Sequence, residues 1–165
     1  DPEGRPTVYG LLPKALRDLR YVGRLDYATE GLLLLTNDGD TLHRLTHPSH
    51  EVDREYEIWL WSVPDRSELD RLEQGVVLED GVARAAAVRI LKKTGKGSVI
   101  SLVLREGKKR EVRRMMEAVG HPVARLRRVR FGPIRLGDLS PGAWRKLDSK
   151  EIRALRNTAR LEEKT

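Results

Sequence analysis

The chain has 165 residues, of which 39% are hydrophobic and 35% are charged, so it is long enough to bury a core as one domain or two small lobes. Its 32 lysines and arginines against 25 acidic residues give a net charge of +7, which favours a polyanionic partner. The lack of cysteine excludes disulfides and thiolate metal sites, and no apolar run approaches the roughly 18 residues that span a bilayer.

The N-terminal third is expected to mix short helices and strands. Residues 11–18 predict a short helix, and residues 21–25 predict a strand. A compact apolar run at residues 32–36 predicts a buried strand, which ends at the Asn-Asp-Gly turn of residues 37–39. Residues 40–46 then predict a second short helix, which ends at the His-Pro pair that follows.

Strands predominate in the rest of the chain. Alternation of polar and apolar residues predicts strands at 55–61 and 123–131, and residues 111–119 show the apolar face of a helix. Further strands are expected at residues 76–78, 87–91 and 99–104, and further helices at residues 67–74 and 149–163. This order of elements predicts an α+β fold, with a mixed, largely antiparallel sheet and helices packed on its faces.

Residues 1–165 are expected to form one domain, with residues 48–54 as the seam between possible lobes at 1–50 and 51–165. The opening sequence, Asp-Pro-Glu-Gly at residues 1–4, resembles the middle of a loop. We therefore expect the natural protein to carry a further segment before it.

Histidines are the candidate metal ligands of this chain. His43 and His47 are four residues apart on a predicted helix and His50 follows closely, so two of them can face one metal ion. No motif supplies a third ligand, and we interpret the three as polar side chains around a helix end. No metal site is predicted.

Basic residues are concentrated between residues 105 and 130, where acidic residues are few. The predicted helix in this region and the strand after it both present arginines, an arrangement suited to phosphate contacts. We therefore predict a nucleic-acid-binding surface formed by Lys108, Arg110, Arg114, Arg127, Arg128 and Arg130. Aromatic residues make up only 5% of the chain, so a base-stacking sheet surface is not expected.

The segment from Gly23 to Leu32 is the most informative stretch of the sequence. A predicted strand ends in Arg-x-Asp, passes through a short polar turn and resumes as a buried strand after Gly31. This pattern lifts the Asp26 carboxylate to the rim of a sheet, between apolar elements that exclude water. An aspartate that merely caps a turn remains the alternative.

Residues 23–39, with the sequence GRLDYATEGLLLLTNDG, resemble the signature of the pseudouridine synthases that modify ribosomal RNA, namely type A of the small-subunit enzymes and their large-subunit relatives. The Glu-Tyr-Glu sequence at residues 55–57 is similar to the family's tyrosine motif, and residues 106–115 are similar to its third motif. Residues 1–8 and 79–81 most resemble the large-subunit synthase B branch.

The resemblance implies roles for individual residues. Asp26 matches the catalytic aspartate, Tyr56 the active-site tyrosine, and Arg113 the basic residue that pairs with the aspartate. Arg24 and Thr29 match positions beside the catalytic residue that help to hold RNA. The N-terminal RNA-binding module and the Asn-Lys-Pro-x-Gly strand that usually open family members are absent, so this chain alone is expected to bind RNA with reduced affinity.

The resemblance also implies the pseudouridine synthase catalytic fold and its function, the isomerisation of a specific uridine in ribosomal RNA, here large-subunit RNA or a pre-ribosomal particle. Because the reaction conserves all atoms, neither a metal nor a redox cofactor is expected. The enzyme is expected to be a cytoplasmic monomer with no membrane partner. Two alternatives stay open: a non-catalytic RNA-binding or ribosome-associated module, and a metal-dependent nuclease that uses Asp26, Asp38 and His43.

Overall fold

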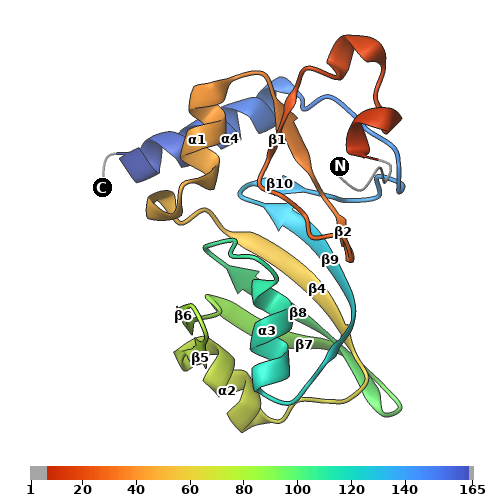
Figure 1. Cartoon of the computed structure of the whole chain (residues 1–165), viewed down its shortest axis with the longest axis vertical. Helices are drawn as coiled ribbons and strands as arrows, with labels where there is room; N and C mark the ends of the chain where they lie inside the picture. The colour runs from red at the N-terminus through yellow and green to blue at the C-terminus, as the bar shows by residue number, and fades with distance from the viewer. Residues whose placement is uncertain (1–6, 164–165) are drawn as a thin grey trace.

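The computed structural model describes residues 7–163, with side chains described as far as residue 158. Within this part of the chain a six-stranded sheet has the order β10-β9-β4-β8-β7, with β2 also paired to β9 (Figure 1). Its strands are β2 (Thr29–Gly31), β4 (Arg54–Leu60), β7 (Ala87–Thr94), β8 (Gly97–Leu104), β9 (Val123–Phe131) and β10 (Ile134–Arg135). Only the β2–β9 pair in this sheet is parallel. The predicted α+β class, with its mixed and largely antiparallel sheet, is confirmed.

Two small antiparallel pairs accompany the sheet: β1 (Arg20–Val22) with β3 (Leu34–Thr36), and β5 (Val76–Leu78) with β6 (Gly81–Ala83). The helices are α1 (Gly39–Thr46), α2 (Arg66–Gln74), α3 (Glu111–Ala118) and α4 (Ser149–Glu163), and short 3-10 turns are η1 (Val8–Leu11), η2 (Lys14–Leu16) and η3 (Pro48–His50). None of the helices within residues 7–163 has both the length and the apolarity that crossing a membrane requires.

The helix predicted at residues 11–18 is wrong. Leu12, the residue before Pro13, is extended with a φ of −103° and a ψ of 149°, so the segment forms the two separate 3-10 turns η1 and η2. Three short strands, β2, β6 and β10, escape prediction because two or three residues carry no periodic signal. Of residues 1–8, which resemble the synthase B branch, residues 1–6 lie outside the described part of the chain.

Apolar side chains gather in two clusters. The larger lies between one face of β4 and β8 and the helices α2 and α3, and its buried members include Ile58, Ile100 and Met115. The smaller cluster includes Leu45 of α1 and Leu155 of α4, two helices that lie side by side in Figure 1. The division of the chain into two lobes stays a prediction.

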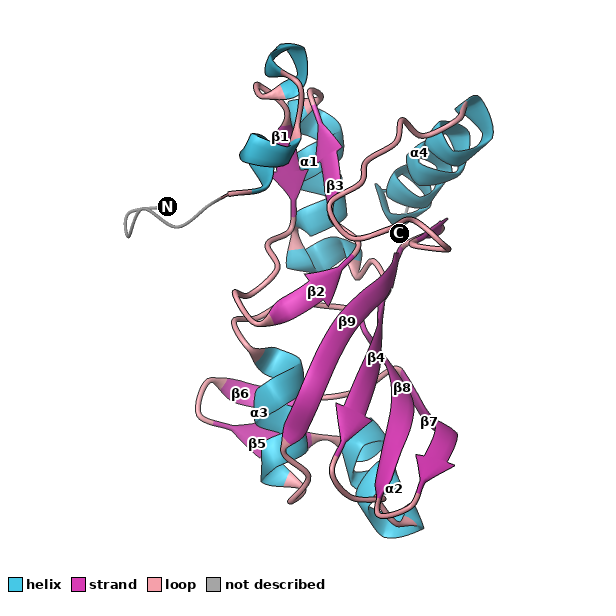
Figure 2. Cartoon of the chain, turned by 90° about the vertical axis from the view of Figure 1, so that its right-hand side faces the viewer, coloured by secondary structure: helices cyan, strands magenta, loops and turns pink. Residues whose placement is uncertain are grey.

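The six-stranded sheet has a covered face and an outer face. Side chains alternate along β4, so Tyr56 and Ile58 point toward α2 and α3, on the covered face. Glu55, Glu57 and Trp59 point to the outer face. Figure 2 shows α3 on one side of β9, beside the loop that leads into β2.

Gly31 is required where β2 meets β9. Its φ is 113°, and a Cβ atom at this position would lie 2.2 Å from the backbone oxygen of Arg128. The N–H of Leu32 donates to that same oxygen at 2.8 Å. Glycine therefore allows the segment that follows Asp26 to run directly against β9.

Candidate active site

The Asp26 carboxylate lies at the N-terminus of α3. Asp26 belongs to the loop between β1 and β2, and its Oδ2 accepts a hydrogen bond of 3.1 Å from the backbone N–H of Arg110. Arg110 caps α3 in a left-handed conformation with a φ of 53°, which few residues other than glycine adopt. Because a helix N-terminus carries free N–H groups and partial positive charge, this position favours a negatively charged group.

Two further contacts hold the loop that carries Asp26. The Thr29 N–H donates to the Asp26 carbonyl oxygen at 2.9 Å and closes a turn. Arg113 Nη2 donates to the carbonyl oxygen of Ala28 at 2.9 Å. Arg113 therefore reaches the backbone of the loop, and the expected ion pair with the Asp26 carboxylate is not formed among the described residues.

Tyr56 and Arg128 are cross-strand partners on the covered face, and they are 8% and 2% exposed. Arg128 Nε donates to the Leu32 carbonyl oxygen at 3.0 Å, and its guanidinium lies 5.2 Å from the centre of the Phe131 ring. Burial lowers the pKa of Arg128, and the Tyr56 hydroxyl beside it opposes that shift. Arg128 is thus a buried cation of the core and not part of an exposed phosphate-binding surface. Among the described residues, Tyr56 makes no hydrogen bond to Asp26.

The arginines on either side of Leu126 point to the outer face of the sheet. Arg125 Nη2 donates to Glu30 Oε2 at 3.0 Å, and Arg127 Nη2 donates to Glu57 Oε2 at 2.9 Å. Both guanidinium groups lie over the Trp59 ring, 4.4 Å and 5.1 Å from its centre. Each of the two positive charges is therefore compensated within the protein.

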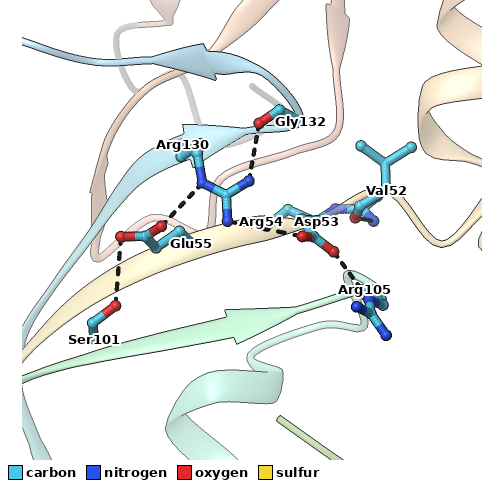
Figure 3. A network of polar contacts seen from close by, with 8 residues as sticks. All are labelled: Val52, Asp53, Arg54, Glu55, Ser101, Arg105, Arg130 and Gly132. Carbon is cyan, nitrogen blue, oxygen red and sulfur yellow. Dashed lines mark hydrogen bonds and ion pairs between the residues drawn. The ribbon is translucent and has the colours of Figure 1, made fainter. Parts of the chain in front are cut away.

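Arg130 lies on the same outer face, within a wider network of polar contacts (Figure 3). Its Nε donates to Glu55 Oε1 at 3.0 Å, and its Nη1 donates to the Gly132 carbonyl oxygen at 3.0 Å. Asp53 lies 3.9 Å from Arg130 and pairs with Arg105 at 3.0 Å. Arg130 is therefore also engaged by neighbouring acidic groups.

A β-bulge divides the arginines of β9 between the two faces. The register of β4 against β9 shifts between Glu55 and Tyr56. Their partners are Arg130 and Arg128, which leaves Val129 as the extra residue of the bulge. This shift brings Arg130 to the outer face and leaves Arg128 on the covered face. We call Arg125, Arg127 and Arg130 the outer-face arginines.

A second group of cations lies in the two loops that meet at the contact between Asp26 and Arg110. Arg24 lies in the same loop as Asp26, and Lys108, Lys109 and Arg110 form the turn that leads into α3. All four basic side chains are exposed, and none forms an ion pair with another side chain of residues 7–158. We call Arg24, Lys108, Lys109 and Arg110 the site cations.

Arg114 and Thr29, which are also predicted to contact RNA, have partners in the fold. Arg114 Nη1 donates to Asp80 Oδ1 at 2.7 Å, in the turn between β5 and β6, and this bond raises the pKa of Arg114. Thr29 begins β2 and pairs with Leu126 of β9. Arg114 therefore connects α3 to the β5–β6 pair, and Thr29 fixes the end of the Asp26 loop.

Asp38 lies at the start of α1, and His43 and His47 lie at its end. The Asp38 carboxylate caps α1 by accepting from the Asp40 N–H at 3.1 Å and from the Thr41 hydroxyl at 2.8 Å. The rings of His43 and His47 lie 5.1 Å apart. Among the side chains described, those of residues 7–158, no three His, Asp or Glu form a group that could hold a metal ion.

Glu111 has no role predicted from the sequence, although it lies next to the residue that binds Asp26. Glu111 is the first residue of α3 and is only 3% exposed. Its Oε1 accepts from the Lys108 N–H at 3.0 Å. Burial and the side chain of Glu106 raise the pKa of Glu111 to about 8. The one sequence feature that could have pointed to Glu111 is that it and Glu106 are the two acidic residues in the basic run of residues 105–114.

Known proteins resemble this chain along most or all of its length. Residues 6–118 match the family model described as RNA pseudouridylate synthase. Ribosomal large subunit pseudouridine synthase B of Yersinia pestis is 46% identical over the whole of this chain, which covers 52% of that relative. An uncharacterized RNA pseudouridine synthase of Aquifex aeolicus (strain VF5) is 42% identical over 93% of this chain and 62% of its own length.

A crystal structure of a pseudouridylate synthase has the same fold, with a TM-score of 0.81 and 30% identity over 91% of this chain and 65% of that one. The chain thus spans between about half and two thirds of the length of these relatives.

Proposed function

The chain belongs to the RNA pseudouridylate synthase family, and on that premise we propose that it isomerises a specific uridine of large-subunit ribosomal RNA to pseudouridine. A relative named as a large-subunit synthase, 46% identical over the whole chain, supports this substrate. The net charge of +7 supports a polyanionic partner. The proposed enzyme acts as a monomer in the cytoplasm, on ribosomal RNA or a pre-ribosomal particle.

The reaction breaks the N1–C1′ bond of uridine, turns the freed uracil and joins its C5 to C1′. The proton that C5 loses balances the proton that N1 gains, so the overall change is an isomerisation. Such a site needs a carboxylate that attacks C1′, stabilises its positive charge or assists removal of a ribose proton. We assign this role to Asp26.

The observation that carries the assignment is the contact between Asp26 and α3. The Arg110 N–H donates to the carboxylate at 3.1 Å, and the positive end of the helix dipole attracts its negative charge. The second carboxylate oxygen, Oδ1, makes no hydrogen bond to the part of the chain whose side chains are described, residues 7–158. One oxygen is therefore anchored, and the other is available to the ribose of a substrate.

Tyr56 and Arg113 complete the proposed catalytic set. Arg113 holds the loop of Asp26 through its bond to Ala28, and so fixes the direction from which the carboxylate meets the ribose. Tyr56 offers a ring on which the detached uracil stacks and a hydroxyl that accepts the C5 proton. Since Tyr56 is only 8% exposed, the base reaches it only after leaving the RNA stack.

The site cations supply the proposed phosphate contacts. Flipping a uridine out of a folded RNA costs a few kcal/mol, which contacts from unpaired cations offset. Arg24, Lys108 and Arg110 carry this role, with Lys109 added because it is exposed in the same turn. The outer-face arginines are left out of the proposal because each already has a glutamate partner.

Asp26→Asn tests the catalytic assignment. The amide keeps the shape of the side chain but cannot attack or stabilise a cationic sugar. We expect pseudouridine formation to fall at least about 10⁴-fold, which corresponds to roughly 5 kcal/mol in the barrier. The measurement is single-turnover release of tritium from C5-labelled uridine in large-subunit RNA, with RNA affinity measured in parallel.

Asp38→Asn is the matched control, because asparagine also caps helices well and this variant is expected to stay fully active. Activity of Asp26→Asn within tenfold of the wild type would refute the role of Asp26. Cleavage of the RNA that EDTA abolishes would favour the metal-dependent nuclease. RNA binding by the wild type without isomerisation would favour the non-catalytic module.

A further inference from the structure

Glu111 closes the turn that leads into α3. Its side-chain Oε1 accepts from the Lys108 N–H at 3.0 Å, and its own N–H donates to the Lys108 carbonyl oxygen at 3.2 Å. Arg110 lies inside this doubly closed turn, in the left-handed conformation, and donates its N–H to Asp26. The direction of that N–H therefore depends on the turn that Glu111 holds.

We infer that Glu111 is a positioning residue, whose buried carboxyl group closes the turn from Lys108 and thereby aims the Arg110 N–H at the Asp26 carboxylate. Glu111 acts on Asp26 only through this N–H and touches no reacting atom. The inference rests on the proposed function, because it gives Glu111 a part in catalysis by Asp26.

The surroundings of Glu111 suit a neutral carboxylic acid. The group is 3% exposed, and its second oxygen, Oε2, is buried without a partner among the described residues. Burial, and after it the neighbouring Glu106 side chain, raise the pKa of Glu111 to about 8. The neutral acid is therefore the main form of Glu111 at neutral pH.

Charged groups face Glu111 and its turn from every neighbouring element. They are Glu106 and Lys108 of the preceding loop, Arg114 on the next turn of α3, Asp80 of the β5–β6 turn, Arg54 of β4 beside Gly107, and Asp26 across the Arg110 amide. Lys108 favours ionisation of Glu111, and Glu106 and burial oppose it. Arg114 is already paired with Asp80, so it offers Glu111 little compensation.

A raised pKa in an acid means that the folded turn is stabilised by the neutral form. This stabilisation is complete below the ordinary value of 4.5 and is lost as the pH rises through about 8. Above that pH, Glu111 carries a buried negative charge beside Glu106. Lys108 favours this charge through its N–H and its ammonium group, but burial outweighs both. The turn then opens toward water, the Arg110 N–H leaves Asp26, and kcat falls while the KM for RNA stays nearly constant.

Glu111→Gln is the central test, because its amide mimics the neutral acid at every pH. Its oxygen still accepts from the Lys108 N–H, and its NH₂ group brings no charge beside Glu106. We expect the variant to keep kcat within about twofold at pH 7. Between pH 7 and pH 8.5, kcat of the wild type should fall about fourfold, as a single ionisation near pH 8 requires, and kcat of the variant should not. Glu117→Gln, an exposed position on the same helix, should keep the wild-type profile.

Glu111→Ala removes the closure at all pH values, and we expect kcat to fall at least about tenfold with little change in KM. If Glu111→Ala does not fold, the comparison of the wild type with Glu111→Gln still tests the inference. Coincident pH profiles for the wild type and Glu111→Gln would overturn the inference.

The amide resonance of Arg110, followed by NMR, separates failure of the inference from failure of the proposed function. If Glu111 determines the direction of the Arg110 N–H, its resonance should shift between pH 7 and pH 9 in the wild type and stay constant in Glu111→Gln. This result does not depend on whether Asp26 is catalytic. A static resonance in the wild type would overturn the inference alone. An active Asp26→Asn variant would instead overturn the catalytic assignment.

Discussion

The two basic regions of this protein differ in what surrounds their charges. The outer-face arginines lie on one surface of β9, where glutamates on β2 and β4 face them at hydrogen-bonding distance. The site cations lie in loops around Asp26, are exposed, and form no ion pair among the described residues. The first group is held in place by neighbouring acids, and the second is available to an external anion.

The difference shows that a run of basic residues does not by itself define a binding surface. Binding of a nucleic acid gains free energy when cations replace the counterions of the phosphates. An arginine already paired with a glutamate must first lose that partner, whereas an unpaired lysine loses only water. Cross-strand pairing of β9 with its neighbours therefore decides which of the predicted RNA-binding residues remain suited to that role.

The largest expected effect is the difference in stability between substitutions on the covered face and on the outer face of β9. Arg128→Ala should lower the free energy of unfolding by about 3 kcal/mol, because it leaves a cavity and removes the donor to Leu32. Arg127→Ala, next in the chain but on the outer face, should lower it by less than about 1 kcal/mol. Urea unfolding of both variants measures the difference. Equal losses would mean that the bulge does not sort these arginines to opposite faces.

A smaller effect, on RNA binding, separates the outer-face arginines from the site cations. Changing Lys108 and Lys109 together to Ala should flatten the dependence of log affinity on log salt by one to two units, at about 0.7 to 0.9 per phosphate contact. Changing Arg125 and Arg127 together to Ala should alter it by less than about 0.5. Filter binding to ribosomal RNA between low and moderate salt gives both slopes. A steeper loss for the arginine pair would show that RNA binds the outer face.

Periodic sequence patterns predicted the long elements well. The alternation at residues 55–61 and 123–131 gave β4 and β9 nearly to the residue, and the apolar face of 111–119 gave α3. Short strands such as β2 were missed because their pairing depends on contacts with β9 and not on their own residues. The helix predicted at residues 11–18 was wrong, because the residue before Pro13 is extended and separates two 3-10 turns.

The candidate site was predicted less evenly than the fold. The Gly-Arg-Leu-Asp sequence placed Asp26 in a loop between strands, and the third motif supplied the helix N-terminus beside it. Burial of Arg128 depends on a one-residue bulge, which no periodicity in β9 specifies. Burial of Glu111 depends on how α3 packs, and a glutamate in a basic run is ordinarily exposed.

The smallest effect is expected from Glu30→Gln, which releases one outer-face arginine. The side chains of Arg125 and Glu30 are 48% and 44% exposed, so their pair stabilises the fold by less than about 1 kcal/mol. Arg125 lowers the pKa of Glu30 below 4.5, so this contribution is present at neutral pH and is lost as the pH falls below that value. The wild type and the variant should therefore differ slightly in urea unfolding at pH 7 and converge in acid. Arg125 still packs on Trp59, and RNA is expected at the site cations, so the salt dependence of RNA binding should change by less than about 0.5. A slope steeper by about 0.9 would show that RNA meets the outer face.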